Sequence, residues 1–182
     1  MNKKSLVALG LLVAGYSMTA SAVSDNTISF QGEVTDETCS LTVNGNETAP
    51  IILLPTVSTS DLAASGDVIG ATTFEMGVTG CTGTSGSDAT ETTIKTVFAG
   101  NLVDTTNGTL GNTGTAKNVT VQIVDTEGKD IDLNTTYTSD GDLSLAAGET
   151  EATATYTAQY YATGAATAGT VAASMQYAIS YQ

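Results

Sequence analysis

The sequence contains no histidine, no tryptophan and no arginine, and these absences remove whole classes of function. Without histidine, the chain has no Ser-His-Asp or Cys-His catalytic arrangement and no imidazole ligand for a metal. Five lysines face nineteen acidic residues. Because phosphate contacts need cations, this balance argues against nucleic acid as a partner. The strong negative charge instead favours a soluble surface that does not bind indiscriminately.

Apolar runs long enough to cross a bilayer are also missing. The first 22 residues have the features of a secretory signal, namely a basic start at Lys3 and Lys4, an apolar stretch over 6–14 and a small-x-small motif over 20–22. A retained anchor is the alternative, but the apolar run is short for that role. We therefore expect residues 1–22 to be removed. Three lysines then remain against nineteen acidic residues, a net charge of −16.

Cysteine is scarce, and both cysteines follow the expected cleavage site. In an exported chain with one possible pairing, a disulfide between Cys39 and Cys81 is the expected state. It would close a loop of about forty residues, for which the chain-entropy model gives about 4 kcal/mol of stabilisation. Two thiolates without histidine do not complete a tetrahedral shell, so we expect no metal and no other cofactor.

Alternation of apolar and polar residues recurs along the chain and predicts an all-β domain. The one stretch with helical character is 58–65, where Ser60 and Asp61 could cap a single turn. Glycine-rich polar stretches over 82–92 and 101–118 are expected as a loop and a long hairpin or loop. A further turn is expected over 140–142. Short strands at such spacing are typical of an immunoglobulin-like sandwich, and we expect them at 38–43, 51–54, 68–78, 93–99, 119–124, 131–133 and 152–162.

The final strand is expected to begin at Gly169 and to run to the end of the chain. Its alternate residues should face the core, and they are Val171, Ala173, Met175, Tyr177, Ile179 and Tyr181. No later segment is present to pair with this strand. We therefore expect either an open sheet edge or a strand that comes from elsewhere.

A second strand pattern lies near the start of the mature chain. One face of it carries Ile28, Phe30, Gly32 and Val34, and the other face is mostly polar. Two interpretations remain open. The segment is either an ordinary first strand of the sandwich or a strand that leaves its own domain and completes a neighbour by β-augmentation.

No group of residues has the pattern of a catalytic site, so we do not expect an enzyme. The acidic stretch over 125–132 does not match the twelve-residue EF-hand loop and is better explained as a polar turn. The neighbouring rings of Tyr160 and Tyr161 could stack on a sugar. Alternation, however, directs one ring into the core and the other outward, which favours a packing role.

Several of these features occur together at the two ends of the chain. Gly32 and Val34 form a Gly-x-Val segment before the first cysteine, Gly169 is fourteenth from the end, and Tyr181 is the penultimate residue. With the signal sequence and the cysteine spacing, they resemble the subunits of chaperone–usher fimbriae over essentially the whole chain. Further stretches resemble the major pilins of the uroepithelial cell adhesin (UCA) type, and these are 54–58, 62–66 and 159–164.

The resemblance implies an immunoglobulin-like sandwich that lacks its final strand. In such fimbriae a periplasmic chaperone lends a strand to the subunit. At the outer-membrane usher, the N-terminal extension of the next subunit then replaces it by donor-strand exchange. The implied organisation is a signal peptide over 1–22, a donor extension over 23–36 and a pilin domain over 37–182. The implied donor face is Ile28, Phe30, Gly32 and Val34, with Gly32 at the position where a side chain would obstruct exchange.

The same resemblance implies a receiving groove and a set of partners. Val171 to Tyr181 would line the groove, and Gly169 and Tyr181 would mark the edge that the chaperone recognises. The chain would be a structural subunit of a fimbrial shaft, exported through the periplasm to the cell surface, where the fimbria supports adhesion to host epithelium. Its partners would be further copies joined head to tail, the chaperone, the usher and a tip adhesin.

Three alternatives are carried beside this interpretation. The first is a minor adaptor subunit of the same fimbria. The second is a sugar-binding tip adhesin, although a mature chain of about 160 residues has no room for an additional lectin domain. The third is a secreted monomeric enzyme on a β-sandwich, which the missing histidine and the missing acid–base pattern make the weakest of the three.

Overall fold

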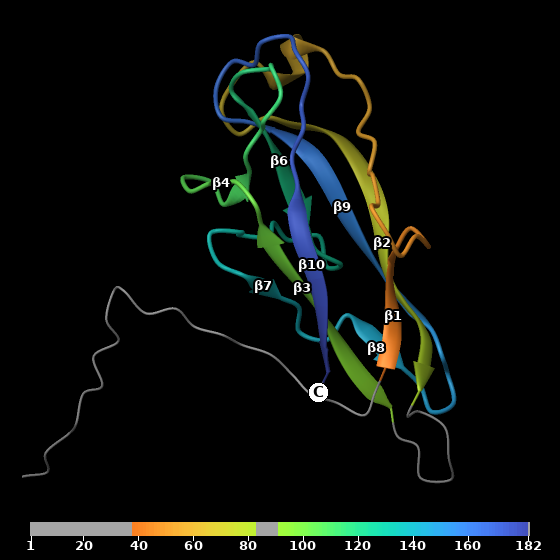
Figure 1. Cartoon of the computed structure of the whole chain (residues 1–182). Helices are drawn as coiled ribbons and strands as arrows, with labels where there is room; N and C mark the ends of the chain where they lie inside the picture. The colour runs from red at the N-terminus through yellow and green to blue at the C-terminus, as the bar shows by residue number, and fades with distance from the viewer. Residues whose placement is uncertain (1–37, 83–90, 182) are drawn as a thin grey trace, which may run out of the picture. The chain divides into compact units, whose positions relative to one another are not determined.

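A computed structural model of the chain describes residues 38–82 and 91–181, all of which belong to one compact unit. These residues form an antiparallel β-sandwich with one short 3-10 helix, η1 (Thr59–Leu62) (Figure 1). The first sheet has the order β1 (Thr38–Val43), β2 (Val68–Thr82), β9 (Ala152–Ala162), β6 (Val119–Val124), β5 (Thr109–Leu110) and β4 (Val103–Asp104). The second has the order β10 (Met175–Tyr181), β3 (Thr92–Gly100) and β7 (Tyr137–Thr138), and β8 (Leu143–Leu145) also pairs with β3. The predicted all-β sandwich is confirmed.

The core lies between the sheets and is built from alternate residues of each strand. The β2 residues Phe74, Met76 and Val78 are buried, as the alternation predicts. The Phe98 ring of β3 meets the Tyr156 ring of β9 edge to face, with 4.9 Å between the ring centroids. Aromatic pairs in this geometry add to the stabilisation that burial gives.

The expected disulfide joins Cys39 of β1 to Cys81 of β2, with 4.2 Å between their Cα atoms. Because β1 is the outermost strand of its sheet and pairs only with β2 among the described residues, the bond ties that edge to the sandwich.

Several strand predictions match the structure and others are wrong. The bounds of β1, β6 and β9 coincide with the predicted ones, and β2 and β3 extend beyond theirs. Residues 51–54 and 131–133 are not strands. Ile131 and Leu133 are nevertheless buried, and the Ile131 amide donates to the Ile123 carbonyl at 2.9 Å. An apolar pattern indicates that a segment packs against the core. It does not indicate whether the backbone of that segment forms hydrogen bonds with a neighbouring strand.

The last strand is shorter than predicted, because β10 begins at Met175 rather than near Gly169. Before it, the chain pairs with the loop over 112–116 and not with β3. Ala116 donates its amide proton to the Thr170 carbonyl at 3.0 Å, and Thr113 donates to the Ala172 carbonyl at 2.8 Å. As a result Ala173, predicted to face the core, is exposed, and Val171 is half-buried.

Two further details differ from the prediction. The cap of η1 is Ser58 rather than Ser60, since the Ser60 amide donates to the Ser58 hydroxyl oxygen at 3.2 Å. The strands β7 and β8 were not predicted, because two or three residues are too few to show a period.

The expected signal sequence, the donor face over 28–34 and most of the loop over 82–92 lie outside the described residues. In the ranges that are described, no helix is long and apolar enough to cross a membrane.

Candidate functional site

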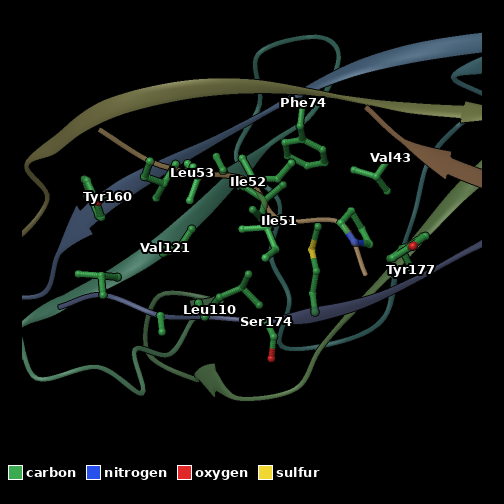
Figure 2. Close-up of a pocket in the computed structure, with 18 of the residues that line it drawn as sticks. Val43, Ile51, Ile52, Leu53, Phe74, Leu110, Val121, Tyr160, Ser174 and Tyr177 are labelled. Atoms are coloured by element: carbon green, nitrogen blue, oxygen red, sulfur yellow. The ribbon is translucent and has the colours of Figure 1, made fainter. Parts of the chain in front are cut away.

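An apolar groove of about 550 Å³ opens on one side of the sandwich (Figure 2). It lies between the extended segment 50–54 on one side and β10 with the residues just before it on the other. None of its lining residues carries a charge.

The floor of the groove is the hydrophobic core itself. Its residues come from four strands of the six-stranded sheet and all are at least nine-tenths buried, namely Phe74, Met76, Leu110, Val121, Ile123 and Ala158. An apolar side chain that entered the groove would therefore pack directly against the core (Figure 2).

One rim of the groove is the segment 50–54. Ile52 and Leu54 pack against the core, whereas Ile51 and Leu53 are 78% and 82% exposed. Within the described ranges, the backbone of 51–54 makes no hydrogen bond. An extended backbone without partners is a template for pairing with another strand.

Tyr160 and Pro55 fix the far end of this rim. The Tyr160 hydroxyl donates to the Pro55 carbonyl at 3.1 Å, and burial raises the pKa of Tyr160 above its ordinary value. Tyr160 lines the groove, whereas the Tyr161 hydroxyl donates to the Asn107 side chain at 3.3 Å. The two rings thus lie at different sites, as alternation predicts, but both are half-buried and neither is fully in the core.

The other rim is β10, the last strand of the four-stranded sheet. It pairs with β3 from Met175, opposite Gly100, to Tyr181, opposite Ile94. Met175, Tyr177 and Ile179 lie on the core-facing side but are only half-buried, unlike Ile94 and Phe98 of β3. The core-facing alternation predicted for this part of the final strand is confirmed. Its incomplete burial shows that the core is open at this edge.

Gly169 and Gly114 shape the chain where it approaches β10. A Cβ atom on Gly114 would lie 2.1 Å from the Thr170 carbonyl oxygen, and one on Gly169 would lie 2.7 Å from the Ala116 Cα atom. Neither position has room for a side chain, because the backbone around Gly114 and the backbone around Gly169 are in direct contact there. Gly169 therefore has a packing reason that the sequence alone did not supply.

This arrangement fits one additional β-strand. Two extended edges border a floor of apolar side chains, and the absence of charge removes any need to desolvate an ion. A strand with alternate apolar residues would place them on the floor and direct its remaining residues to solvent. The predicted groove residues Met175, Tyr177, Val171 and Ala173 do line the groove, whereas Gly169, Ile179 and Tyr181 are not among its lining residues.

The sequence did not predict that the segment 50–54 is an unpaired edge. It also did not predict the floor residues Leu110, Val121 and Ala158. The continuous apolar run from Ile51 to Leu54 predicts a strand, and nothing in it indicates that this strand has no partner. These three floor residues come from three different strands, and only the assembled sheet brings them together.

A second cluster that the sequence did not reveal surrounds Asp142. Its carboxylate accepts hydrogen bonds from the Tyr156 hydroxyl at 2.6 Å, from the Thr96 hydroxyl at 2.7 Å and from the Ser139 hydroxyl. Burial alone would raise the pKa of Asp142, but the hydrogen bonds from Ser139, Tyr156 and Thr96 outweigh it and hold this pKa below its ordinary value. Burial raises the pKa of Tyr156, and its hydrogen bond to Asp142 raises it further. The cluster joins β3 and β9 to the connection between β7 and β8, and it lies outside the groove.

The part of the chain that the structure describes gives little support for a metal site. There, no three side chains among histidine, cysteine, aspartate and glutamate gather as a metal site would require. In the acidic stretch, the Asp125 carboxylate accepts the amide protons of Glu127 at 2.9 Å and Lys129 at 2.8 Å, which is the predicted polar turn.

Comparison with known proteins places the chain among fimbrial subunits. The F17 fimbrial protein of Escherichia coli is 38% identical over 178 residues, with 96% of each chain covered. The major fimbrial subunit SMF-1 of Stenotrophomonas maltophilia (strain K279a) is 32% identical over 187 residues, which cover 93% of this chain and 99% of SMF-1.

Solved structures show the same fold. The P pilus rod subunit PapA is 20% identical with a TM-score of 0.59, over 79% of this chain and 99% of PapA. A chain of a chaperone–usher pilus is 21% identical with a TM-score of 0.60, over 87% of this chain and 96% of that one. A family model described as fimbrial protein matches residues 28–182. With this match and the F17 relative, the chain belongs to the fimbrial protein family.

Proposed function

We propose that this chain is a structural subunit of a bacterial surface fimbria and that copies of it join head to tail to form the shaft. The observation that carries the proposal is the groove, in which two extended edges border an apolar floor continuous with the core. A subunit of this kind needs a strand from another chain to bury its core completely.

The donor in this proposal is the segment over 23–36 of the neighbouring subunit, exposed once a signal peptide over 1–22 is removed. Ile28, Phe30 and Val34 would occupy the groove of the domain over 37–182, and burying each such side chain is worth about 1.5–3 kcal/mol. New backbone hydrogen bonds to the rims add to this. Because donor and acceptor are different surfaces, the contact does not close on itself and produces a filament.

The comparisons support a shaft role rather than an adaptor role. F17 fimbrial protein and the major subunit SMF-1 match nearly the whole chain, and PapA is a rod subunit with the same fold. The motifs over 54–58, 62–66 and 159–164 favour the UCA type within the family. The proposed partners are further copies, a periplasmic chaperone, an outer-membrane usher and a tip adhesin. The proposed role is structural and not enzymatic.

Deletion of residues 23–35 after the signal sequence tests the donor assignment. We expect the shortened subunit to bind its chaperone in the periplasm, because the groove is intact, and to be absent from fibres seen by electron microscopy. The full-length chain expressed from the same operon is the control. Fibres built from the shortened subunit would show that the donor lies elsewhere.

A single substitution tests the role of the donor segment without changing the acceptor groove. Gly32→Asn should slow or prevent exchange, since a side chain at this position would meet the groove floor, while chaperone binding should change little. Polymerisation at the normal rate would count against the role given to Gly32. In both experiments, size-exclusion chromatography of the wild type separates a polymeric or chaperone-bound pilin from a secreted monomeric enzyme.

A further inference from the structure

Asparagine is followed by glycine at two places in the chain, Asn44-Gly45 and Asn107-Gly108, and the two pairs have different surroundings. Such a pair can deamidate when the glycine amide nitrogen attacks the side-chain carbonyl carbon of the asparagine, because glycine has no side chain to hinder the approach. The reaction needs a glycine amide that is free and exposed, and a backbone that can move. These requirements can be compared at the two pairs.

Asn44 and Gly45 form the two-residue loop of a hairpin that follows β1. Val43 and Asn46 close this hairpin with two backbone hydrogen bonds of 2.9 and 3.0 Å. The φ angles of Asn44 and Gly45 are +49° and +75°, as such a loop requires. Both residues are exposed, and no group in the described residues accepts a hydrogen bond from the Gly45 amide. The attacking nitrogen is therefore accessible to the solvent base that must remove its proton.

Two neighbouring groups favour the reaction at Asn44. The Glu75 amide donates to the Asn44 Oδ1 atom at 2.8 Å, and this bond would stabilise the negative charge that Oδ1 acquires during the attack. The Asn46 side-chain amide donates to the Asn44 main-chain carbonyl at 3.1 Å. A hydrogen bond at this oxygen stabilises the deprotonated Gly45 amide, which is the attacking species.

The second pair, Asn107-Gly108, has none of these features. Gly108 is buried, and its amide donates to the Asp104 carbonyl at 2.8 Å. The Asn107 Oδ1 atom accepts a hydrogen bond from the Tyr161 hydroxyl at 3.3 Å. A Cβ atom on Gly108 would clash with the Asp132 side chain, so the backbone is closely packed there. This pair cannot react until that part of the domain opens.

We propose that Asn44 is a site of spontaneous deamidation in the folded chain and that Asn107 is not. The Gly45 nitrogen loses its proton to solvent and forms a bond to the Asn44 Cγ atom. The bond between Cγ and Nδ2 breaks, and Nδ2 takes up a proton from solvent and leaves as ammonia, which gives a cyclic succinimide. Water then opens either ring carbonyl and yields aspartate or isoaspartate. The net change is the uptake of one water molecule and the release of one ammonia molecule.

The two products would change the hairpin in different ways. Aspartate leaves the main chain unchanged and adds a negative charge. Isoaspartate adds one carbon atom to the main chain between Val43 and Asn46, so the two hydrogen bonds that close the loop would lose their geometry. Val43 lines the groove, so the modified residue lies next to the proposed acceptor site. The reaction needs only the folded domain and water, and it does not depend on the proposed function.

Incubation of the mature chain, as recovered from the producing cells, in mildly alkaline buffer tests this proposal. Peptide mass spectrometry follows the conversion of each asparagine, and methylation by an isoaspartyl methyltransferase identifies the isoaspartate product. We expect conversion at Asn44 to be at least about tenfold faster than at Asn107, because the buried pair must open locally before it reacts.

The same chain in denaturant, with its disulfide reduced, is the matched control. Unfolding removes the difference in surroundings, so the two asparagines should then react at similar rates. Conversion at Asn107 that equals or exceeds conversion at Asn44 in the folded chain would overturn the proposal. So would an Asn44 that stays unmodified in the folded chain while both sites react in the denatured one.

Two variants provide a second measurement. Asn44→Gln keeps an amide side chain but would have to form a six-membered ring, which closes far more slowly. This variant should therefore lose most of the isoaspartate labelling of the folded chain, whereas Asn107→Gln should keep it. Labelling of Asn44→Gln at the wild-type level would show that the reaction occurs elsewhere and would overturn the proposal.

Discussion

A Cβ atom on Gly169 would lie 2.3 Å from the amide nitrogen of Ala116, closer than any real Cβ contact allows. The same amide donates its proton to the Thr170 carbonyl, so the two backbones are held together at this crossing. The crossing directs the chain into β10, which forms one rim of the groove. Gly169 thus connects a local packing requirement to the position of the proposed acceptor edge.

Gly169→Ala should destabilise the subunit by about 1–3 kcal/mol, since the added methyl group must push two bonded segments apart. Gly164→Ala is the control, because its Cβ atom would meet nothing closer than 3.7 Å. Denaturant unfolding of the purified mature subunit measures both. Equal stability of the two variants would contradict the packing role of Gly169.

Filling the groove from its floor should prevent polymerisation without unfolding the domain. Ala158 is buried and lines the groove, so the larger side chain in Ala158→Leu would occupy the space that a donor residue needs. Thr155→Leu, on an exposed position of the same strand, is the control. Fibre yield and the secondary structure of the chaperone-bound subunit would be measured together. Normal fibres from the Ala158→Leu chain would contradict strand insertion at this floor.

The pH dependence of stability should reflect Asp142. Its folded-state pKa is lowered, so its contribution is present above the unfolded value, about 3.9, and is lost as the pH falls through the lower folded value. Asp142→Asn should cost about 1–3 kcal/mol at neutral pH, because buried hydroxyl groups lose a charged acceptor. It should also flatten the stability profile below about pH 4.

Asp140→Asn, at an exposed neighbouring position, is the control for this experiment and should leave both the neutral stability and the profile close to wild type. Unfolding midpoints of the two variants and the wild type, measured from pH 2 to pH 7, would test this prediction. A profile of the Asp142→Asn chain that parallels the wild type would show that this carboxylate has no special role.

The disulfide should contribute substantially to stability. Cys39 and Cys81 are 42 residues apart, and the chain-entropy model gives about 4 kcal/mol for a loop of this size. The double variant Cys39→Ser/Cys81→Ser should lower the free energy of unfolding by that order, and reductant should then have no further effect. A small loss, below about 1 kcal/mol, would indicate that β1 is held mainly by its pairing with β2.

Local patterns predicted the strands that are long and regularly alternating. The bounds of β6 and β9 coincide with the predicted ones, because the apolar period there persists for six residues or more. The same rule failed at Ala173, where the alternation continues in the sequence although the chain changes its pairing partner before Met175. At 51–54 a continuous apolar run predicted a strand, but within the described residues this segment pairs with no neighbouring strand.

The sequence by itself determined the composition of the sandwich, the pairing of the two cysteines and the core-facing residues of most strands, because these depend on residue type and on a period of two. The tertiary structure decided which edges remain open, that Leu110, Val121 and Ala158 meet on one floor, and that Asp142 accepts hydrogen bonds from Thr96 and Tyr156. These features join residues that are distant in the chain, and such contacts arise only when the sheets are assembled.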